Sequence, residues 1–293
     1  MIVDPRLRPT RAGASFLVTI GLVVLWDVAV TATFFARPGW FSDGEFPFAL
    51  FGSAIALFIG VSINAAYGRW WEARTLWGQV VNSSRSLGRQ AVTTIGDQGA
   101  ARAVVQAQIA YVHALRTSLR GQDLPHEASV HLPDAPDPDD PRVADTPTAI
   151  LARCGDILAR SRARDDVSEL ARVQLESTLV ALTDAQGGLE RIKNTPLPVQ
   201  YRVLPSLFAR LFCLVLPFAV VHDLMWATPV GSALISFMFL ITVKVGTDLA
   251  DPFTDGVHDV PMTTLCRTIE IDLLRLIREE APPRLTPTDS VLW

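Results

Sequence analysis

An uncharged apolar run, Phe46–Ile63, constrains this chain more than any other feature, because it passes directly into a stretch rich in aromatic and charged side chains, Asn64–Arg74. A run of this length crosses a bilayer as an α-helix, since every backbone amide is then hydrogen-bonded within the segment. The change to tryptophan and arginine marks the point where the helix leaves hydrocarbon for headgroups and water. We therefore expect a membrane-spanning helix that continues beyond the bilayer.

Three further apolar stretches accompany this run. Gly13–Phe35 is apolar apart from Asp27, and Leu211–Val221 and Met225–Val243 follow late in the chain. A content of 49% hydrophobic and 19% charged residues would also suit a large soluble domain, but apolar segments clustered in this way do not suit soluble core helices. The sequence predicts an all-α membrane protein with four transmembrane helices, at approximately 13–35, 46–63, 207–225 and 226–244.

The distribution of Lys and Arg sets the expected orientation, because these residues concentrate on the cytosolic side. Arg6, Arg8 and Arg11 precede the first span, further arginines follow the second, and Lys244 ends the fourth. Both termini are therefore expected in the cytosol, in a multi-pass protein of the cell inner membrane or plasma membrane. The cytosolic helical region is predicted at approximately 64–202 and 245–293.

Within the cytosolic region the hydrophobic residues recur at helical spacing, which predicts amphipathic helices packed on one another. Thr146–Ala163 and Asp165–Ala185 are expected to be two of them. His131–Pro141 is too rich in proline for a helix and is expected to be a loop. Asp259, followed by Pro261, is expected to cap a further helix that runs to Leu276.

The apolar run 46–63 is striped. One edge carries small residues, which allow helices to approach closely in lipid: Gly52, Ala56 and Gly60. The neighbouring edge carries a file of uncharged side chains: Ser53, Leu57 and Val61. Such a file could line a narrow pore, or it could pack a helix bundle. The residues alone leave both interpretations open.

Several polar or aromatic residues in or near the spans require an explanation. A carboxylate at Asp27 is costly in lipid, so it is either functional or faces a neighbouring helix and is satisfied there by a hydroxyl, an amide or water. Arg210 interrupts the third apolar run and is expected to extend toward the headgroups. The indoles of Trp70, Trp71 and Trp77 are expected to be interfacial anchors.

The sequence offers little for catalysis, metals or nucleic acid. The aspartates at 248, 251, 255 and 259 have a spacing that a hard cation could use, but Pro252 and Gly256 break the run, so no metal site is expected. Cys154, Cys213 and Cys266 are far apart and are expected to be buried small hydrophobes. We expect no enzyme activity, no cofactor and, at a net charge of −4 without a basic stripe, no nucleic-acid partner.

A set of short motifs in a fixed order resembles the bestrophin family of ion channels, particularly its bacterial members. The motifs are Asn64–Arg74, Leu76–Gly78, Ser84–Arg85, Arg89–Gln90, Thr195–Pro198, Leu216–Phe218, Asp251–Phe253 and Leu265–Glu270. The likeness runs from the first span to the C-terminal helix.

This resemblance implies one channel domain over residues 1–293, assembled as a homopentamer around a central pore. It places a hydrophobic neck at Ser53, Leu57 and Val61 and a second, cytosolic aperture near Leu170. The implied function is passive conduction of small monovalent ions through the bilayer, with anions such as chloride favoured. A monovalent cation channel of the same fold and a non-conducting membrane scaffold are the alternatives.

Two departures from the family pattern carry expectations of their own. The first neck position is Ser53, where members usually have a bulkier apolar residue, so the outer end of the neck is expected to be wider or wetter. Animal members carry an acidic calcium clasp after the Asn/Asp-Pro-Phe motif, and 254–259 here lacks most of those carboxylates. We therefore expect that Ca²⁺ does not gate this channel.

Overall fold

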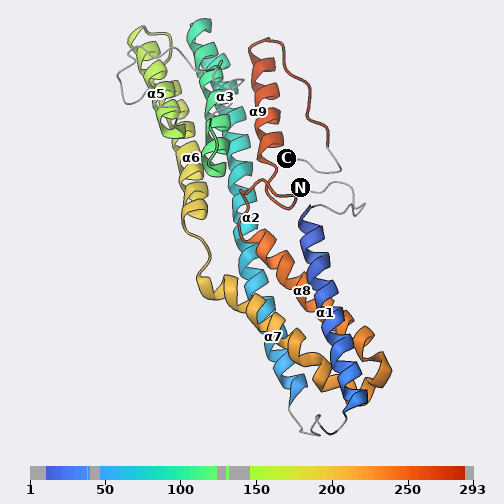
Figure 1. The fold of residues 1–293 in the computed structure, drawn as a ribbon. Coiled ribbons are helices and arrows are strands. Elements are labelled where there is room, and N and C mark those ends of the chain that lie inside the picture. The colour runs from blue at the N-terminus through green and yellow to red at the C-terminus, as the bar shows by residue number, and fades with distance from the viewer. Residues whose placement is uncertain (1–10, 38, 40–46, 124–129, 132–145, 288–293) are drawn as a thin grey trace. The chain divides into compact units, whose positions relative to one another are not determined.

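A computed structural model describes residues 11–37, 39, 47–123, 130–131 and 146–287, with side chains from residue 16 onward. All regular elements in these ranges are helices (Figure 1). Three helical segments are long and apolar enough to cross a membrane: Phe16–Ala36, Phe48–Thr94 and Val199–Leu249. Most of the predicted 131–141 loop lies outside the described residues.

The chain forms two compact units. The spanning unit comprises the described parts of Pro5–Arg69 and Pro196–Asp251, and the body unit comprises Trp70–Thr195 and the chain from Pro252 onward. The spanning unit contains α1 (Arg11–Ala36), the first part of α2 (Phe48–Thr94), α7 (Val199–Leu224) and α8 (Thr228–Leu249). The remaining helices belong to the body unit.

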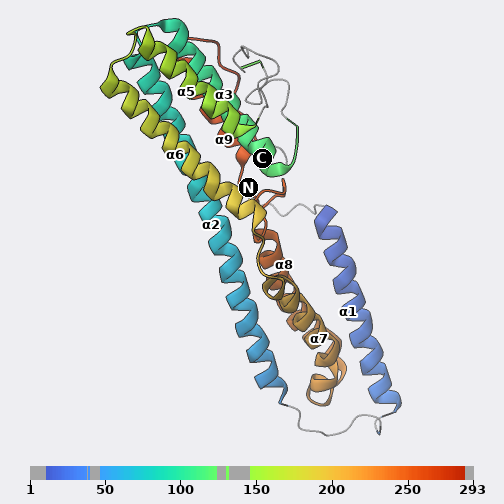
Figure 2. The same cartoon turned by 90° about the vertical axis from the view of Figure 1, so that its left-hand side faces the viewer.

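A single 3₁₀ turn, η3 (Met225–Ala227), divides the third apolar segment into α7 and α8. Met225 ends α7 with a positive φ of 50°, and Pro229 lies in the first turn of α8, where its missing N–H costs no hydrogen bond. The chain reverses here, so α7 and α8 pack along each other, and α1 packs on both (Figure 2). The core of this unit is apolar and includes Ile55, Ile59, Phe212, Leu216 and Leu240.

The body unit is a helical bundle in which α3 (Gln98–Arg120) packs against α5 (Pro147–Ala163) and α9 (Met262–Leu276), and α5 packs against α6 (Glu169–Asn194). The predicted amphipathic pattern is confirmed, since the apolar residues that recur along α2 and α3 form the core: Val80, Leu87, Val104, Ile109, Tyr111, Leu115 and Leu119. Polar ties join the helices inside this core. The side-chain amide of Gln108 donates to the Ser84 hydroxyl at 2.8 Å, and the Thr178 hydroxyl donates to the side-chain carbonyl oxygen of Gln90 at 2.9 Å.

Three sequence predictions about the body unit are wrong in detail. The helix expected from Asp165 begins at Glu169, because Asp165 has a left-handed φ of 64° and Ser168 caps the helix by accepting from the Ala171 amide. Asp259 does not cap α9; its carboxylate accepts from Thr254 and from the Gly256 amide and so closes the preceding loop. Trp77 is not an interfacial anchor, since it is fully buried in the core.

Candidate functional site

The predicted neck residues lie on the face of α2 that points away from the core of the spanning unit. Leu57 is 73% exposed and Val61 is 48% exposed, and Ser53 is also exposed. Ile55 and Ile59, on the opposite face, are buried against α7 and α8. The Ser53 hydroxyl donates back to the Ala49 carbonyl one turn earlier, so its proton is used within the helix. The subunit thus leaves an uncharged strip, with two large apolar side chains, uncovered.

The small-residue edge of α2 only partly behaves as expected within one subunit. A Cβ added at Gly52 would lie 3.2 Å from the Phe212 ring, a tight contact, so glycine favours the close approach of α2 to α7 there. A Cβ at Gly60 would meet nothing within 4 Å, and Ala56 is exposed. Close packing inside the subunit therefore rests on Gly52, while the rest of this edge faces outward.

The predicted aperture residue, Leu170, lies in the first turn of α6 and is 82% exposed. It borders an open recess whose other walls come from α2 and α6: Arg89, Gln90, Thr94, Ser168, Ala171 and Gln174.

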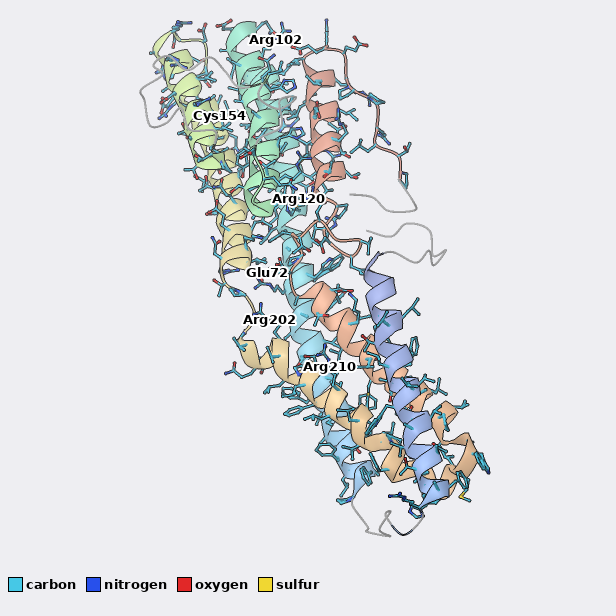
Figure 3. All side chains as sticks on the ribbon, viewed as in Figure 1. Glu72, Arg102, Arg120, Cys154, Arg202 and Arg210 are labelled. Carbon is cyan, nitrogen blue, oxygen red and sulfur yellow. The ribbon has the colours of Figure 1, made fainter. Side chains whose placement is uncertain are left out.

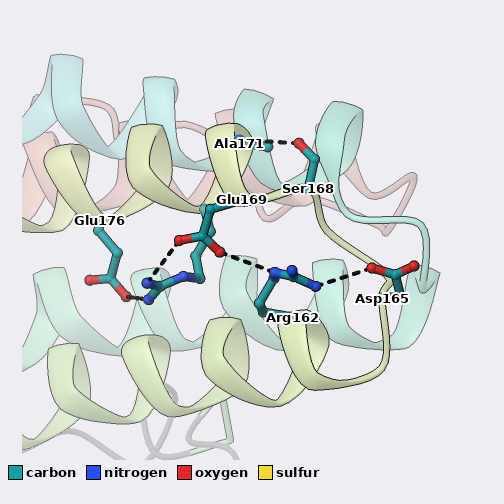
Figure 4. Close-up of polar contacts among 7 residues, drawn as sticks. Arg162, Asp165, Ser168, Glu169, Ala171 and Glu176 are labelled. Atoms are coloured by element: carbon teal, nitrogen blue, oxygen red, sulfur yellow. Dashed lines mark hydrogen bonds and ion pairs between the residues drawn. The ribbon is translucent and has the colours of Figure 1, made fainter.

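Charged side chains near the start of α6 pair with one another (Figure 4). The Arg162 guanidinium contacts Asp165 and Glu169, both at 3.1 Å, and Arg172 contacts Glu169 at 3.4 Å and Glu176 at 3.7 Å. Two hydrogen bonds lower the pKa of Glu169 from its usual value, and the one from Arg162 has a larger effect than the one from Arg172. Arg89 is exposed and contacts no carboxylate among the described residues, and it is the only charged residue lining the recess there, so the recess beside Leu170 carries a positive charge.

The loop after α8 contains an arginine contact that the sequence did not suggest. Arg120 lies in the last turn of α3 (Figure 3). Its guanidinium reaches Asp255 at 2.6 Å and donates to the Thr263 hydroxyl at 2.9 Å. Asp255 has a left-handed φ of 71°. Three of the four aspartates that had suggested a cation site therefore have separate partners, since Asp248 pairs with Lys244, Asp255 with Arg120, and Asp259 closes its own loop. A basic residue in the last turn of α3 was the available signal.

Asp27 has the hydroxyl partner that one of its two interpretations requires, at one of its two carboxylate oxygens. Its carboxylate is fully buried and accepts a hydrogen bond from the Ser232 hydroxyl of α8 at 3.1 Å. Ser236, one turn further along α8, is also buried, but its hydroxyl has no hydrogen-bond partner among the described residues. The hydrogen bond between Asp27 and Ser232 joins α1 to α8 inside the spanning unit.

We expect Ser232→Ala to lower the free energy of unfolding by about 1 kcal/mol, because an interhelical hydrogen bond in a membrane protein contributes about that much to stability. Ser236→Ala is the matched control and should be neutral, since its hydroxyl forms no bond to lose. Thermal unfolding of the two purified variants in one detergent makes the comparison. Equal losses for both would show that the Asp27–Ser232 contact has no special weight.

The fold defines an all-helical membrane protein, and comparisons with known proteins identify its family. The chain matches the family described as bacterial/fungal bestrophin protein over residues 13–275. A bestrophin homologue of known structure from Klebsiella pneumoniae superposes with a TM-score of 0.83 at 30% identity, covering 90% of this chain and 99% of that one. The chain belongs to the bestrophin family.

Relatives with curated names extend the comparison. The voltage-dependent anion channel-forming protein YneE of Escherichia coli K12 is 38% identical over 243 residues, which are 82% of this chain and 80% of YneE. The voltage-dependent anion channel-forming protein mll4386 of Mesorhizobium japonicum is 34% identical, over 83% of this chain and 78% of the relative. These names describe the relatives, and they agree with the family expected from the sequence motifs.

Proposed function

We propose that this protein is a homopentameric channel that conducts small monovalent anions, such as chloride, passively across the bacterial inner membrane. One observation carries the proposal: Leu57 and Val61 form an exposed, uncharged strip on a helix long and apolar enough to span a membrane. In the family to which the chain belongs, this face of the second membrane helix is the one that points at the shared axis. Residues left uncovered in the subunit would then line a path between subunits.

A neck of this composition gates by wetting. Rings of Leu57 and Val61 make an apolar collar, which passes hydrated ions when it widens and excludes water when it narrows. The collar holds no fixed charge, so it discriminates by the cost of ion dehydration. Ser53, with its small side chain, gives the collar a wider outer end. Leu170 supplies a second narrow point at the cytosolic end.

Fixed charge beside Leu170 sets the sign of the permeant ion in this proposal. Arg89 lines the same recess as Leu170 and contacts no carboxylate among the described residues, whereas Glu169 is held between Arg162 and Arg172. A ring of uncompensated guanidinium groups raises the local concentration of anions. The printed names of the relatives, which describe anion channels, support the same direction.

The topology follows the charges of the sequence. We place four spans per subunit, with α7 and α8 crossing separately around the η3 turn, and both termini in the cytosol. The body unit then lies on the cytosolic side, where it carries Leu170. Residues 1–293 act as one channel domain in this arrangement.

Reversal potentials measured in planar bilayers under asymmetric potassium chloride test the proposal. We expect the reversal potential to lie close to the chloride equilibrium potential. Arg89→Gln should move it toward zero, while Arg102→Gln, which removes an arginine paired with Glu279, should leave it unchanged. A wild-type reversal at the potassium potential would instead support the cation channel, and absence of any protein-dependent current would support a scaffold.

A further inference from the structure

Arg210 is a charged residue in the apolar stretch of α7 that neither the neck nor the aperture uses. It lies about two turns beyond Arg202 on the same helix (Figure 3). Its side chain is exposed, and no carboxylate or hydrogen-bond acceptor among the described residues contacts it. A guanidinium in a membrane-spanning segment is costly without a counter-ion. The missing counter-ion must therefore come from outside the described part of the chain.

Arg210 lines a recess between α1, α7 and α8 with a volume of about 210 Å³, whose walls are partly polar and partly apolar. Its polar walls are Thr19, Ser206, Arg210, Lys244 and Thr247. The Lys244 ammonium is already neutralised by Asp248, whose two carboxylate oxygens lie at 2.6 and 2.8 Å. The Lys244 ammonium has three N–H donors, and two of them are used by Asp248, so one remains to bind a ligand. Arg210 supplies the net positive charge of the recess. The recess is suited to a group that is anionic and rich in oxygen.

An apolar trough of about 230 Å³ continues from this recess. Arg210, Thr19 and Leu240 border both, and the trough is otherwise lined by Leu22, Val23, Trp26, Cys213 and Leu214. Trp26 follows Thr19 by seven residues, so the trough extends about 10 Å along α1. The Trp26 indole donates to the Leu214 carbonyl at 2.9 Å and meets the Phe218 ring edge-on, which joins α1 to α7 at this level.

We propose that this groove binds an anionic phospholipid, with its phosphate at Arg210 and Lys244 and an acyl chain along the trough as far as Trp26. The juxtaposition of an unpaired cation with a long apolar wall fits an amphiphile and does not fit a soluble anion, which would leave the trough empty. Arg210 presents the planar donor fork that matches a phosphate. By occupying the groove, the lipid bridges α1 and the α7–α8 pair. The proposal rests on membrane insertion and does not depend on ion conduction.

Quenching of Trp26 by brominated lipids tests the proposal on the full-length purified protein. The probes are phosphatidylglycerol and phosphatidylcholine, each brominated on the acyl chain, in otherwise identical mixed micelles. The Trp26 contribution is the difference between the wild type and Trp26→Phe. We expect phosphatidylglycerol to quench Trp26 at about tenfold lower concentration than phosphatidylcholine, because both lipids carry a phosphate but the choline ammonium of phosphatidylcholine opposes the positive charge of Arg210.

Three variants and one competitor sharpen the test. Arg210→Gln should abolish the preference for phosphatidylglycerol, Arg210→Lys should keep most of it, and Arg202→Gln, on the same helix but outside the groove, should keep all of it. Soluble glycerol phosphate should not displace the brominated lipid. Equal quenching of the wild type by both lipids would overturn the proposal even if Arg210→Gln fails to fold. So would a full preference in Arg210→Gln, or displacement by glycerol phosphate.

Discussion

Leu57→Ala will increase the ion current several-fold. In the proposed pore, Leu57 forms the middle ring of the apolar collar, and each alanine removes the branched end of one side chain from the narrowest point. A wider collar stays wet for a larger fraction of time and presents a lower dehydration cost. Single-channel recording in planar bilayers separates a rise in conductance from a rise in open probability, and either outcome agrees with the prediction.

The control for this experiment is Leu234→Ala. Leu234 lies on α8 and is 62% exposed in the subunit, close to the 73% of Leu57, so both replacements remove the same apolar surface from similarly uncovered positions. Only Leu57 lies on the predicted pore face. An unchanged current in Leu57→Ala, with the oligomer intact, would remove this residue from the neck.

Arg120→Ala will destabilise the body unit and loosen the loop that follows α8. The Arg120 side chain is 6% exposed and contacts both Asp255 and Thr263, so its loss removes the ion pair of Asp255 and leaves Thr263 with only the longer 3.4 Å contact from Arg116. Burial lowers the pKa of Arg120, and the neighbouring Asp255 acts in the opposite direction. Removing one member of a buried ion pair costs about 3 kcal/mol, and the partial exposure of Asp255 reduces this to about 2 kcal/mol.

Thermal unfolding and limited proteolysis measure the two effects, with Arg102→Ala as the control. Arg102 also pairs with a carboxylate, Glu279, but its side chain is largely exposed, so the loss should stay below about 1 kcal/mol. Adding Ca²⁺ to Arg120→Ala should not restore stability, because Asp248 and Asp259 keep their own partners and the Asp255 carboxylate alone offers too few oxygen ligands for calcium. Restoration by Ca²⁺ would reveal a cation site that the arginine contact normally replaces.

The sequence predicted the features that depend on local hydrophobic pattern. Uninterrupted apolar stretches identified the spanning helices, but the striping of 46–63 did not identify the buried face, which is formed by Ile55 and Ile59 and belongs to neither stripe. The amphipathic helices of the body unit were predicted for the same reason, since burial of one face is a periodic property. The order of short motifs added the family, which no single motif would have given.

Predictions failed where a residue has two uses and tertiary contacts decide between them. Asp259 is of a residue type that commonly caps helices, and it stands just before α9. Its carboxylate instead accepts a hydrogen bond from the Gly256 amide and closes the preceding loop. Trp77 follows two tryptophans at the predicted membrane exit, but its position along the continuing helix places its side chain in the core of the body unit. The Arg120–Asp255 contact joins positions far apart in the chain, so no local sequence pattern predicts that these two residues pair.

Modification of Leu57→Cys by a charged, membrane-impermeant thiol reagent most directly tests whether this face of α2 encloses the ion path. The native cysteines give little background, because all three are buried, and burial raises the pKa of Cys154 and Cys266 to about 12. We predict that the reagent reacts at position 57 and blocks the current. A current that persists after mass spectrometry shows full modification, or a thiol that reacts only with lipid-soluble reagents, would contradict a pore at this position.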